Sequence, residues 1–366
     1  MHPILDQSEL LRYQRHFPVI GLEGQQQLKH AKILCVGAGG LGSPALQYLA
    51  AAGIGTLGIM DADHIELSNL QRQILFHEQD IGRNKAEVIA ERLLALNHQV
   101  SVQVYAEFLS LVNAEDRIQA YDLVLDATDN YQARYLLNEV CRRLKKPLIS
   151  ASIYQFDAQI SVFNYKNGPC YQCLYPEPPP ATLTPNCATG GVLGVLPGVA
   201  GAIQATEAIK VILGLGKVLS GTLLSLDLLT MRFNQFEIVK QDCLNHPAVT
   251  FDFSSDSRSS NGFETIRATE LKQWLIMNKK IQLIDVRESY EREICHMGGE
   301  HIPLSLFETH IEKLDRVVPT VVYCKSGRRS ATACQILVDA GFKQVSNLEG
   351  GILEWIDAVD NRLMRY

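Results

Sequence analysis

Short runs of β-branched and aliphatic residues alternate with helical patterns between residues 31 and 150. Such alternation is typical of a parallel sheet with helices on both faces. Two later β-rich runs, at 159–164 and 232–239, predict strands that extend the same sheet in the antiparallel direction. The sequence therefore predicts an α/β fold with a doubly wound, Rossmann-like, mainly parallel sheet. We expect its strands at 32–36, 56–60, 101–104, 123–126 and 147–150, and its clearest helices at 43–52, 84–96 and 131–144.

A polar break separates this pattern from a second one. Residues 254–262 read SSDSRSSNG, a composition typical of an interdomain linker. We predict a first domain at 1–250, a linker at 251–262 and a smaller α/β domain at 263–366. Five prolines between 176 and 185 exclude helix and central strand there. They predict a loop that crosses the active-site face.

Composition narrows the function classes. With 366 residues and 46% hydrophobic content, the chain can bury two cores of ordinary size. A formal net charge of -6 leaves no broad basic surface, so a nucleic-acid partner is not expected. The first ten residues lack a basic and apolar leader, and polar side chains interrupt the longest apolar tract, 190–216. We expect a cytoplasmic enzyme without a membrane partner, whose apolar tract is a buried loop and helix.

A glycine-rich loop follows the first strand. Gly37, Gly39, Gly40 and Gly42 lie between that strand and a helix, where backbone N–H groups can approach a polyphosphate. Asp61 ends the second strand, where a carboxylate can accept hydrogen bonds from a ribose. Taken alone, this pattern favours an NAD-type dehydrogenase, because the glycines do not identify the nucleotide.

Charged residues near this loop favour ATP instead. The segments SNLQRQ (68–73) and GRNK (82–85) bring Arg72 and Lys85 towards the phosphates. Cleavage of a triphosphate at its α-phosphorus needs cations and Mg²⁺ to neutralise the departing charge. Asp129 follows the fourth strand at the carboxyl edge of the sheet and is a natural Mg²⁺ ligand. The alternative makes Arg72 and Lys85 solvated surface charges and Asp129 a helix N-cap.

Several motifs together resemble the MoeB/ThiF family, relatives of ubiquitin-activating enzymes, over residues 10–247: RYQR (12–15), GAGGLG (37–42), SNLQRQ, ATDN (127–130) and the later cysteines. The resemblance implies a homodimer that adenylates the C-terminal glycine of a ubiquitin-like sulfur carrier ending in Gly-Gly. It implies that Arg15 reaches the partner's phosphates. It also implies contacts to ATP or its Mg²⁺ from the glycine loop and from Asp61, Ser68, Asn69, Leu70, Gln71, Arg72, Lys85, Asp129 and Asn130.

Two pairs of metal-binding side chains have the same spacing. Cys170 and Cys173 form a CxxC pair, and Cys243 and His246 form the second, which together predict a structural zinc site. The resembled family has a cysteine where His246 stands, so a lost site with leftover thiols is the alternative. A redox role for CxxC is disfavoured, because we do not expect the pair to open a helix after a strand.

Cys187 lies in TPNCATGG (184–191), between the proline-rich loop and the apolar helix. A flexible loop suits a nucleophile that must reach an acyl-adenylate. The resemblance adds that a cysteine here can form a thioester or acyl disulfide with the carrier. The alternative is a small residue packed under the loop. We expect the remaining cysteines of the first and second domains to be core or surface residues: Cys35, Cys141, Cys295 and Cys334.

The second domain carries a cysteine loop. Strands at 283–286 and 321–323 precede it, and Cys324 opens CKSGRRS directly before a helix. The helix N-terminus, Lys325, Arg328 and Arg329 all favour a thiolate. This loop, together with DVR (285–287), His296, Ile302-Pro303 and LEGGILEW (348–355), resembles a single-domain rhodanese over nearly all of residues 263–366. The resemblance implies a persulfide on Cys324. One alternative is a phosphatase, but Arg329 is fifth after the cysteine, whereas that motif has arginine sixth. The other is a catalytically dead docking module, which the intact cysteine and cationic loop disfavour.

The two domains make a consistent pair. The first would activate a carboxylate with ATP and Mg²⁺, and the second would supply sulfur as a Cys324 persulfide, taken from thiosulfate or a cysteine desulfurase persulfide, to give a carrier thiocarboxylate. The carrier's pathway could be molybdopterin, thiamine, tRNA thiolation or cysteine synthesis. The competing hypotheses are a dinucleotide-dependent oxidoreductase and a non-catalytic scaffold for a ubiquitin-like partner.

Overall fold

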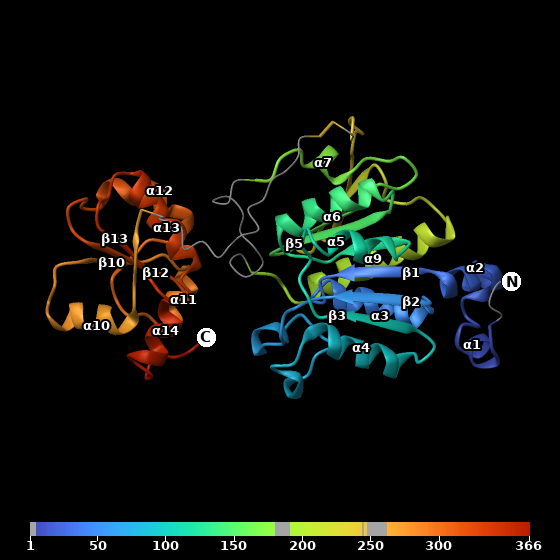
Figure 1. The fold of residues 1–366 in the computed structure, drawn as a ribbon, viewed down its shortest axis with the longest axis horizontal. Helices are drawn as coiled ribbons and strands as arrows, with labels where there is room; N and C mark the ends of the chain where they lie inside the picture. The colour runs from blue at the N-terminus through green and yellow to red at the C-terminus, as the bar shows by residue number, and fades with distance from the viewer. Residues whose placement is uncertain (1–4, 180–190, 244, 247–261) are drawn as a thin grey trace. The chain divides into compact units, whose positions relative to one another are not determined.

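The computed structural model describes residues 5–179, 191–243, 245–246 and 262–366 (Figure 1). The chain divides into two compact units, Met1–Phe253 and Ser254–Tyr366. Each unit is described by itself.

The first unit is built on an eight-stranded sheet in the order β3-β2-β1-β4-β5-β6-β7-β8. Strands β1 to β5 are parallel, and β6, β7 and β8 continue the sheet as antiparallel neighbours. The predicted doubly wound sheet with an antiparallel extension is confirmed. The strands are β1 (Lys32–Val36), β2 (Thr56–Met60), β3 (Ser101–Tyr105), β4 (Leu123–Asp126), β5 (Leu148–Tyr154), β6 (Asp157–Phe163), β7 (Thr222–Asp227) and β8 (Arg232–Glu237).

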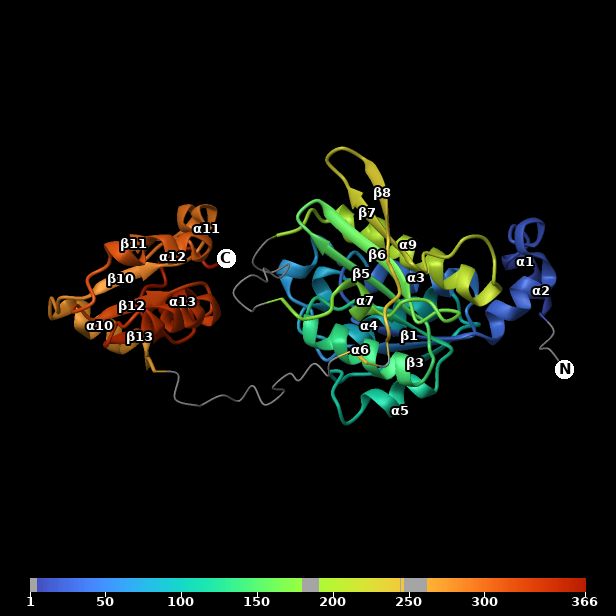
Figure 2. The same ribbon diagram turned by 90° about the horizontal axis from the view of Figure 1, so that it is seen from above.

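Helices cover both faces of this sheet (Figures 1 and 2). One core joins the sheet to α3, α4 and α9, and a second core joins its other face to α5, α6 and α7. The helices are α1 (Gln7–Arg12), α2 (Phe17–His30), α3 (Gly42–Ala52), α4 (Lys85–Leu96), α5 (Ala114–Gln119), α6 (Tyr131–Arg143), α7 (Tyr171–Leu174) and α9 (Val195–Leu213), with 3-10 turns at Leu67–Asn69 and Glu78–Asp80.

Strand β7 was not expected from the sequence. Its segment, TLLSLD, contains three leucines and one β-branched residue, Thr222, so local propensity gives no strand signal. Pairing with β6 on one side and β8 on the other supplies the strand instead. Figure 2 shows β7 and β8 as a hairpin at the edge of the sheet.

The parallel register aligns the carboxyl ends of the central strands. Val36 pairs with Met60 of β2 and with Asp126 of β4. The residues that follow these three strands therefore emerge at one edge of the sheet. In open α/β sheets ligands bind at that edge.

The long apolar tract forms α9, as expected. By length and composition this helix could cross a membrane, but 44% of its apolar window is buried in the protein, as in a core helix. The polar side chains in it are bonded internally: Gln204 donates to the Asp126 and Ile149 carbonyls, and Glu207 accepts from Lys210 and Leu219 N–H. These features are those of a core helix.

The second unit has a five-stranded parallel sheet in the order β11-β10-β12-β13-β9. Two apolar cores fill its two faces. The predicted second, smaller α/β domain is confirmed. Its strands are β9 (Glu264–Ile266), β10 (Gln282–Asp285), β11 (Glu300–His301), β12 (Thr320–Tyr323) and β13 (Val345–Leu348), and its helices are α10 (Ala268–Ile276), α11 (Ser289–Ile294), α12 (Phe307–His310), α13 (Arg328–Asp339) and α14 (Gly351–Ala358), with 3-10 turns at Leu304–Leu306 and Ile311–Lys313.

Candidate active sites and metal centre

The glycine loop packs too tightly for any side chain at two positions. Gly37 has φ +96°, and a Cβ there would lie 2.5 Å from the Ala127 carbonyl oxygen. A Cβ on Gly42, where α3 begins, would lie 2.1 Å from the Gly37 carbonyl oxygen. The loop is thus drawn against the end of β4. Its backbone N–H groups lie at a helix N-terminus, which is a natural anion site.

Asp61 braces this loop from the end of β2. One carboxylate oxygen accepts the Ala38 N–H at 2.7 Å, and the other accepts the Asp63 N–H at 2.8 Å. Burial raises the pKa of the Asp61 carboxyl above its usual value, although these N–H groups and Lys85 oppose the rise. The carboxylate therefore shapes the loop as well as lying where a ribose contact was predicted.

The two predicted cations differ in their surroundings. The Cγ atom of Arg72 lies 3.5 Å from the position that a Cβ on Gly40 would occupy, and its guanidinium donates to the Ser68 carbonyl at 3.1 Å. Lys85 is buried, and its ammonium pairs with Asp63 at 2.9 Å. The alternative that Lys85 is a solvated surface charge is therefore wrong. Its charge is already held by a carboxylate at the same edge of the sheet.

The rest of the SNLQRQ segment lies beside Arg72 and is held by contacts of its own. Asn69 is buried, and its side-chain oxygen accepts the Glu66 N–H at 3.1 Å. Ser68 donates to the Glu66 carboxylate at 3.2 Å. A Cβ on Gly194, just before α9, would lie 2.1 Å from the Gln71 carbonyl. Leu70 is half-buried against the first core.

Gln73 is a residue that the sequence reasoning did not single out. Its side chain is buried, and its Nε2 lies 3.4 Å from where a Cβ on Gly39 would be. Its Oε1 is buried with no hydrogen-bond partner in the described part of the chain. The signal was available, since Gln73 closes the motif that carries Arg72.

Asp129 and Asn130 follow β4 and are both exposed. The side-chain oxygen of Asn130 accepts the Ala133 N–H at 2.8 Å and caps α6. The alternative that Asp129 caps this helix is therefore wrong. Asp126, the last residue of β4, is fully buried and accepts hydrogen bonds from Thr128 and Ser150. Asp129 is thus the carboxylate that this strand end presents outwards.

Arg15 is exposed in the turn between α1 and α2. Nearby Tyr13 accepts a hydrogen bond from Asn97 and packs against Gly53, where α3 ends. Helix α3 has 11 residues, so its two ends are about 16 Å apart. The Arg15 turn therefore lies near the end of α3 that is opposite the glycine loop of its own chain.

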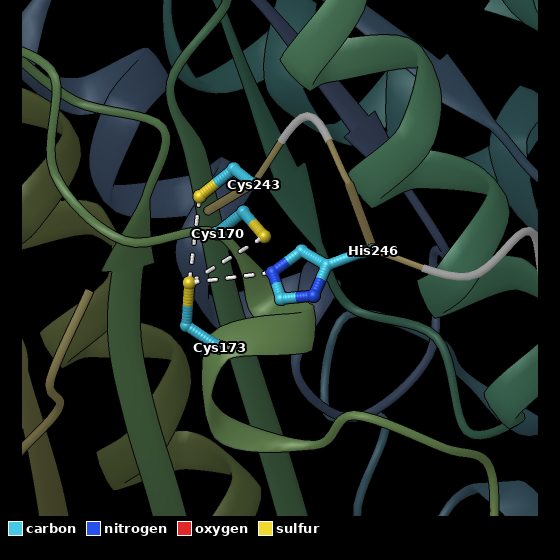
Figure 3. Close-up of side chains that lie close together, drawn as sticks. All are labelled: Cys170, Cys173, Cys243 and His246. Carbon is cyan, nitrogen blue, oxygen red and sulfur yellow. Dashed lines mark hydrogen bonds between the residues drawn. The ribbon is translucent and has the colours of Figure 1, made fainter. Parts of the chain in front are cut away.

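The four predicted metal ligands come together (Figure 3). Cys170 and Cys173 lie at α7, while Cys243 and His246 follow β8. The Cys173 Sγ atom lies 3.8 Å from Cys170 Sγ, 3.4 Å from Cys243 Sγ and 3.6 Å from His246 Nε2. All four ligand atoms are within 4.8 Å of one another.

These separations fit a single tetrahedral ion. Zn–S bonds of about 2.3 Å at tetrahedral angles place sulfur atoms about 3.8 Å apart. Burial raises the pKa of the Cys170 thiol to about 12, so a thiolate there needs a cation. Cys170 does cap a short helix, α7, but residues 164–169 separate that helix from β6, so the pair does not open a helix directly after a strand. The Tyr171 N–H donates to Asn138 at 2.9 Å, which ties this centre to α6.

The other cysteines fall into two groups. Cys187 lies outside the described residues. Cys35, Cys141, Cys295 and Cys334 are all buried, as core residues. Burial raises the pKa of the Cys35, Cys141 and Cys334 thiols well above the usual range, which disfavours reactive thiolates at these positions.

In the second unit, Cys324 follows β12 and is 1% exposed. Its Sγ atom accepts the Gly327 N–H at 3.2 Å and the Ser330 hydroxyl at 3.3 Å. Gly351, with φ +62°, packs so closely that a Cβ there would lie 2.5 Å from the Cys324 carbonyl oxygen. The loop therefore cradles sulfur at the start of α13, as the sequence predicts.

The cations of this loop are not equivalent. Arg329 pairs with Glu291 at 2.5 and 2.7 Å, so its charge is neutralised within the domain. Burial lowers the pKa of the Arg329 guanidinium, but Glu291 and the nearby Cys324 outweigh this and raise it, so Arg329 also interacts with the cysteine as expected. Arg328 is exposed, and the Lys325 ammonium lies over the Tyr366 ring, 4.7 Å from its centroid. Glu291 and Tyr366 carried no signal in the sequence.

Beneath the loop, Asp285 and Arg287 form a fully buried ion pair with contacts of 2.8 and 2.7 Å. Burial raises the pKa of the Asp285 carboxyl, but Arg287 outweighs this and leaves the pKa below its usual value. Asp285 and Arg287 therefore brace the domain from inside.

Comparison with known proteins assigns both units. A model of the ThiF family matches residues 11–245. The chain belongs to the ThiF family. A model of the rhodanese-like domain matches residues 267–358. The chain is thus a fusion of the two predicted domain types.

Relatives are similar over the whole chain. The probable adenylyltransferase/sulfurtransferase MoeZ of Mycobacterium tuberculosis is 40% identical, over 99% of this chain and 96% of the relative. The adenylyltransferase and sulfurtransferase MOCS3 of Xenopus laevis is 37% identical, over 99% and 89%. The probable molybdopterin-synthase adenylyltransferase of Porphyra purpurea is 39% identical, over 97% and 94%. The predicted enzyme class, an adenylyltransferase and sulfurtransferase, is confirmed.

Solved structures match about two thirds of the chain. E. coli MccB crystallised with ATP has a TM-score of 0.57 at 25% identity, covering 64% of this chain and 74% of that one. PaaA, at 24% identity and a TM-score of 0.57, covers 66% and 77% and shows the fold alone.

Proposed function

We propose that this chain uses ATP to adenylate the C-terminal glycine carboxylate of a ubiquitin-like sulfur carrier ending in Gly-Gly, and then transfers sulfur to that carboxyl group from a Cys324 persulfide. The observation that carries the proposal is the pairing, in one ThiF-family chain, of a tightly packed glycine loop with a sulfur-cradling cysteine loop. This fusion also argues against a dinucleotide-dependent oxidoreductase or a passive scaffold.

In the first step the carrier carboxylate attacks the α-phosphorus of ATP, and pyrophosphate leaves. The glycine loop N–H groups and Arg72 would stabilise the phosphate charge, while Asp61 holds the loop in shape. Asp129 would hold Mg²⁺, which neutralises the charge of the departing pyrophosphate. The remaining predicted contacts to ATP or its Mg²⁺ would come from Ser68, Asn69, Lys85 and Asn130.

In the second step the terminal sulfur of the Cys324 persulfide attacks the acyl carbon, and AMP leaves. The carrier is then joined to Cys324 through an acyl disulfide. A second thiolate must cleave the S–S bond to release the thiocarboxylate and form a protein disulfide. We assign that role to Cys187. The persulfide itself would come from thiosulfate or from a cysteine desulfurase, in the cytoplasm.

Zinc bound by Cys170, Cys173, Cys243 and His246 would be structural. Four protein ligands leave no open coordination position for a substrate. The ion would fasten the segment after β8 to α7 and, through Asn138, to α6. Because Asn130 caps the N-terminus of α6, the centre would also help to hold the end of β4, which Asp129 follows.

We further propose a homodimer in which Arg15 serves the partner's nucleotide. The turn that carries it lies at the wrong end of α3 to serve its own glycine loop. A groove of about 410 Å³ begins at the adjacent His16 and runs along the small apolar residues of α3 and α9. A second copy seated there would cover the exposed face of α9.

Carrier-dependent exchange of pyrophosphate into ATP tests the adenylation step. The wild-type chain should catalyse exchange only when a Gly-Gly-ended carrier is present. Asp129→Asn should abolish exchange and leave the fold intact, because Asp129 is exposed. Exchange that does not need the carrier, or an Asp129→Asn variant with wild-type exchange, would contradict the proposed step or the proposed Mg²⁺ ligand respectively.

A further inference from the structure

Tyr366 lies beside the sulfur-transfer loop, although it follows α14 and is distant from Cys324 in sequence. Both views place this end of the chain next to α11 (Figures 1 and 2). Its hydroxyl accepts a hydrogen bond from Arg287 at 2.6 Å and donates to Glu291 of α11 at 3.3 Å. The Arg287 guanidinium also lies 5.7 Å from the ring centroid.

These contacts fix the ring from below. Arg287 is fully buried and held by Asp285 and by the Glu291 and Cys295 carbonyls, so it cannot move with the ring. Burial raises the pKa of the Tyr366 hydroxyl above its usual range, so it stays protonated and remains a donor to Glu291. These hydrogen bonds therefore hold the Tyr366 ring in one position.

The Tyr366 ring also contacts the Cys324 loop, through Lys325. The Lys325 ammonium lies 4.7 Å from the Tyr366 centroid, and Lys325 is the residue directly after Cys324. An ammonium over an aromatic face is attracted to it, which limits the directions that a long, flexible lysine can take. With Arg329 paired to Glu291, Lys325 and the more exposed Arg328 are the loop's remaining cations.

We propose that Tyr366 is a positioning residue of the sulfur-transfer site: its ring seats the Lys325 ammonium where an anionic sulfur donor enters. The inference rests on the proposed sulfur transfer and names the donor as small and anionic, with thiosulfate as the probe. In that reaction the Cys324 thiolate attacks the outer sulfur of thiosulfate. A Cys324–sulfur bond forms, the S–S bond of thiosulfate breaks, and sulfite leaves with the electron pair.

The full-length chain tests this with thiosulfate and cyanide, by measuring thiocyanate formation. Tyr366→Leu removes the ring and the hydroxyl, and should raise the KM for thiosulfate about 3- to 10-fold with little change in kcat, because one weak cation–π seat is lost. Tyr366→Phe keeps the ring and should hold the KM within about twofold of wild type. A merely structural role would not split KM from kcat, or leucine from phenylalanine, in this way.

Lys325→Met supplies the second half of a double-mutant cycle. It should raise the KM by itself, and adding Tyr366→Leu should raise it no further, since the two residues form one unit. If Tyr366→Leu does not fold, as judged by tryptophan fluorescence, Tyr366→Met fills the space without an aromatic face. An unchanged KM in the non-aromatic variant, or effects that multiply independently, would overturn the inference. A wild-type chain that forms no thiocyanate would instead refute the proposed sulfur transfer.

Discussion

Arg329 places both arms of its guanidinium on the Glu291 carboxylate, at 2.5 and 2.7 Å. The pair joins the first turn of α13, next to the Cys324 loop, to α11. Burial raises the pKa of the Glu291 carboxyl, but Arg329 outweighs this and leaves the pKa below its usual value. The least exposed cation of the loop is therefore paired with a carboxylate of the fold while it also interacts with Cys324.

This pair predicts how the second unit responds to acid. Glu291 and Asp285 both have lowered pKa values in the folded state. The unfolded pKa of such carboxyls is about 4. Above that pH they contribute their full stabilisation of the fold, and this stabilisation is lost as the pH falls through the lower pKa values of the folded state. The urea midpoint of the second unit should therefore fall steadily below about pH 4.

Tryptophan fluorescence measures this unit selectively in the whole chain, because both tryptophans, Trp274 and Trp355, lie in it. Glu291→Gln should cost about 2 kcal/mol of unfolding free energy at neutral pH, by weakening hydrogen bonds to a charged group. It should also flatten part of the acid dependence. A variant with wild-type stability and an unchanged pH profile would show that the pair contributes little.

A second prediction concerns the metal centre. Zinc should co-purify at about one equivalent per chain, and Cys173→Ser should lower both zinc content and Tm, since a four-ligand site contributes to folding. Cys141→Ala is the matched control, because it removes a buried thiol of the same core without removing a ligand. It should lower Tm while keeping the zinc. Metal-free wild-type protein whose Tm matches that of Cys173→Ser would mean that His246 marks a decayed site.

Sequence reasoning worked where one residue type is required by local geometry. The glycine loop needs residues without a Cβ, and the metal pairs need cysteine or histidine ligands at a fixed spacing, so the sequence could predict both. It failed where tertiary pairing decides. Strand β7 depends on its neighbours, Glu291 has no motif of its own, and Tyr366 meets Lys325 only because the fold returns to the loop. The N-cap of α6 was assigned to Asp129 in one alternative, but the neighbouring Asn130 caps it.

The dimer hypothesis makes a prediction that hybrid proteins can test. Arg15→Ala and Asp129→Asn should each abolish carrier-dependent exchange alone. If Arg15 acts across the dimer, mixing the two variants under subunit exchange should restore part of the activity, because one of the two sites in a hybrid carries neither substitution. A mixture of two Asp129→Asn samples is the control. No recovery in a mixture shown to contain hybrids would place Arg15 in its own chain's site or outside catalysis.

The division of labour between the two units is the central claim, and mass spectrometry of the carrier tests it most directly. The carrier would be incubated with ATP, thiosulfate and a thiol reductant, and read for sulfur in place of oxygen at its C-terminus. Wild-type chain should give the thiocarboxylate, and Cys187→Ala should form it more slowly. Cys324→Ala should give none while keeping carrier-dependent pyrophosphate exchange. Thiocarboxylate formed at the normal rate by Cys324→Ala, with thiosulfate as the sole donor, would show that the second unit is not the sulfur source.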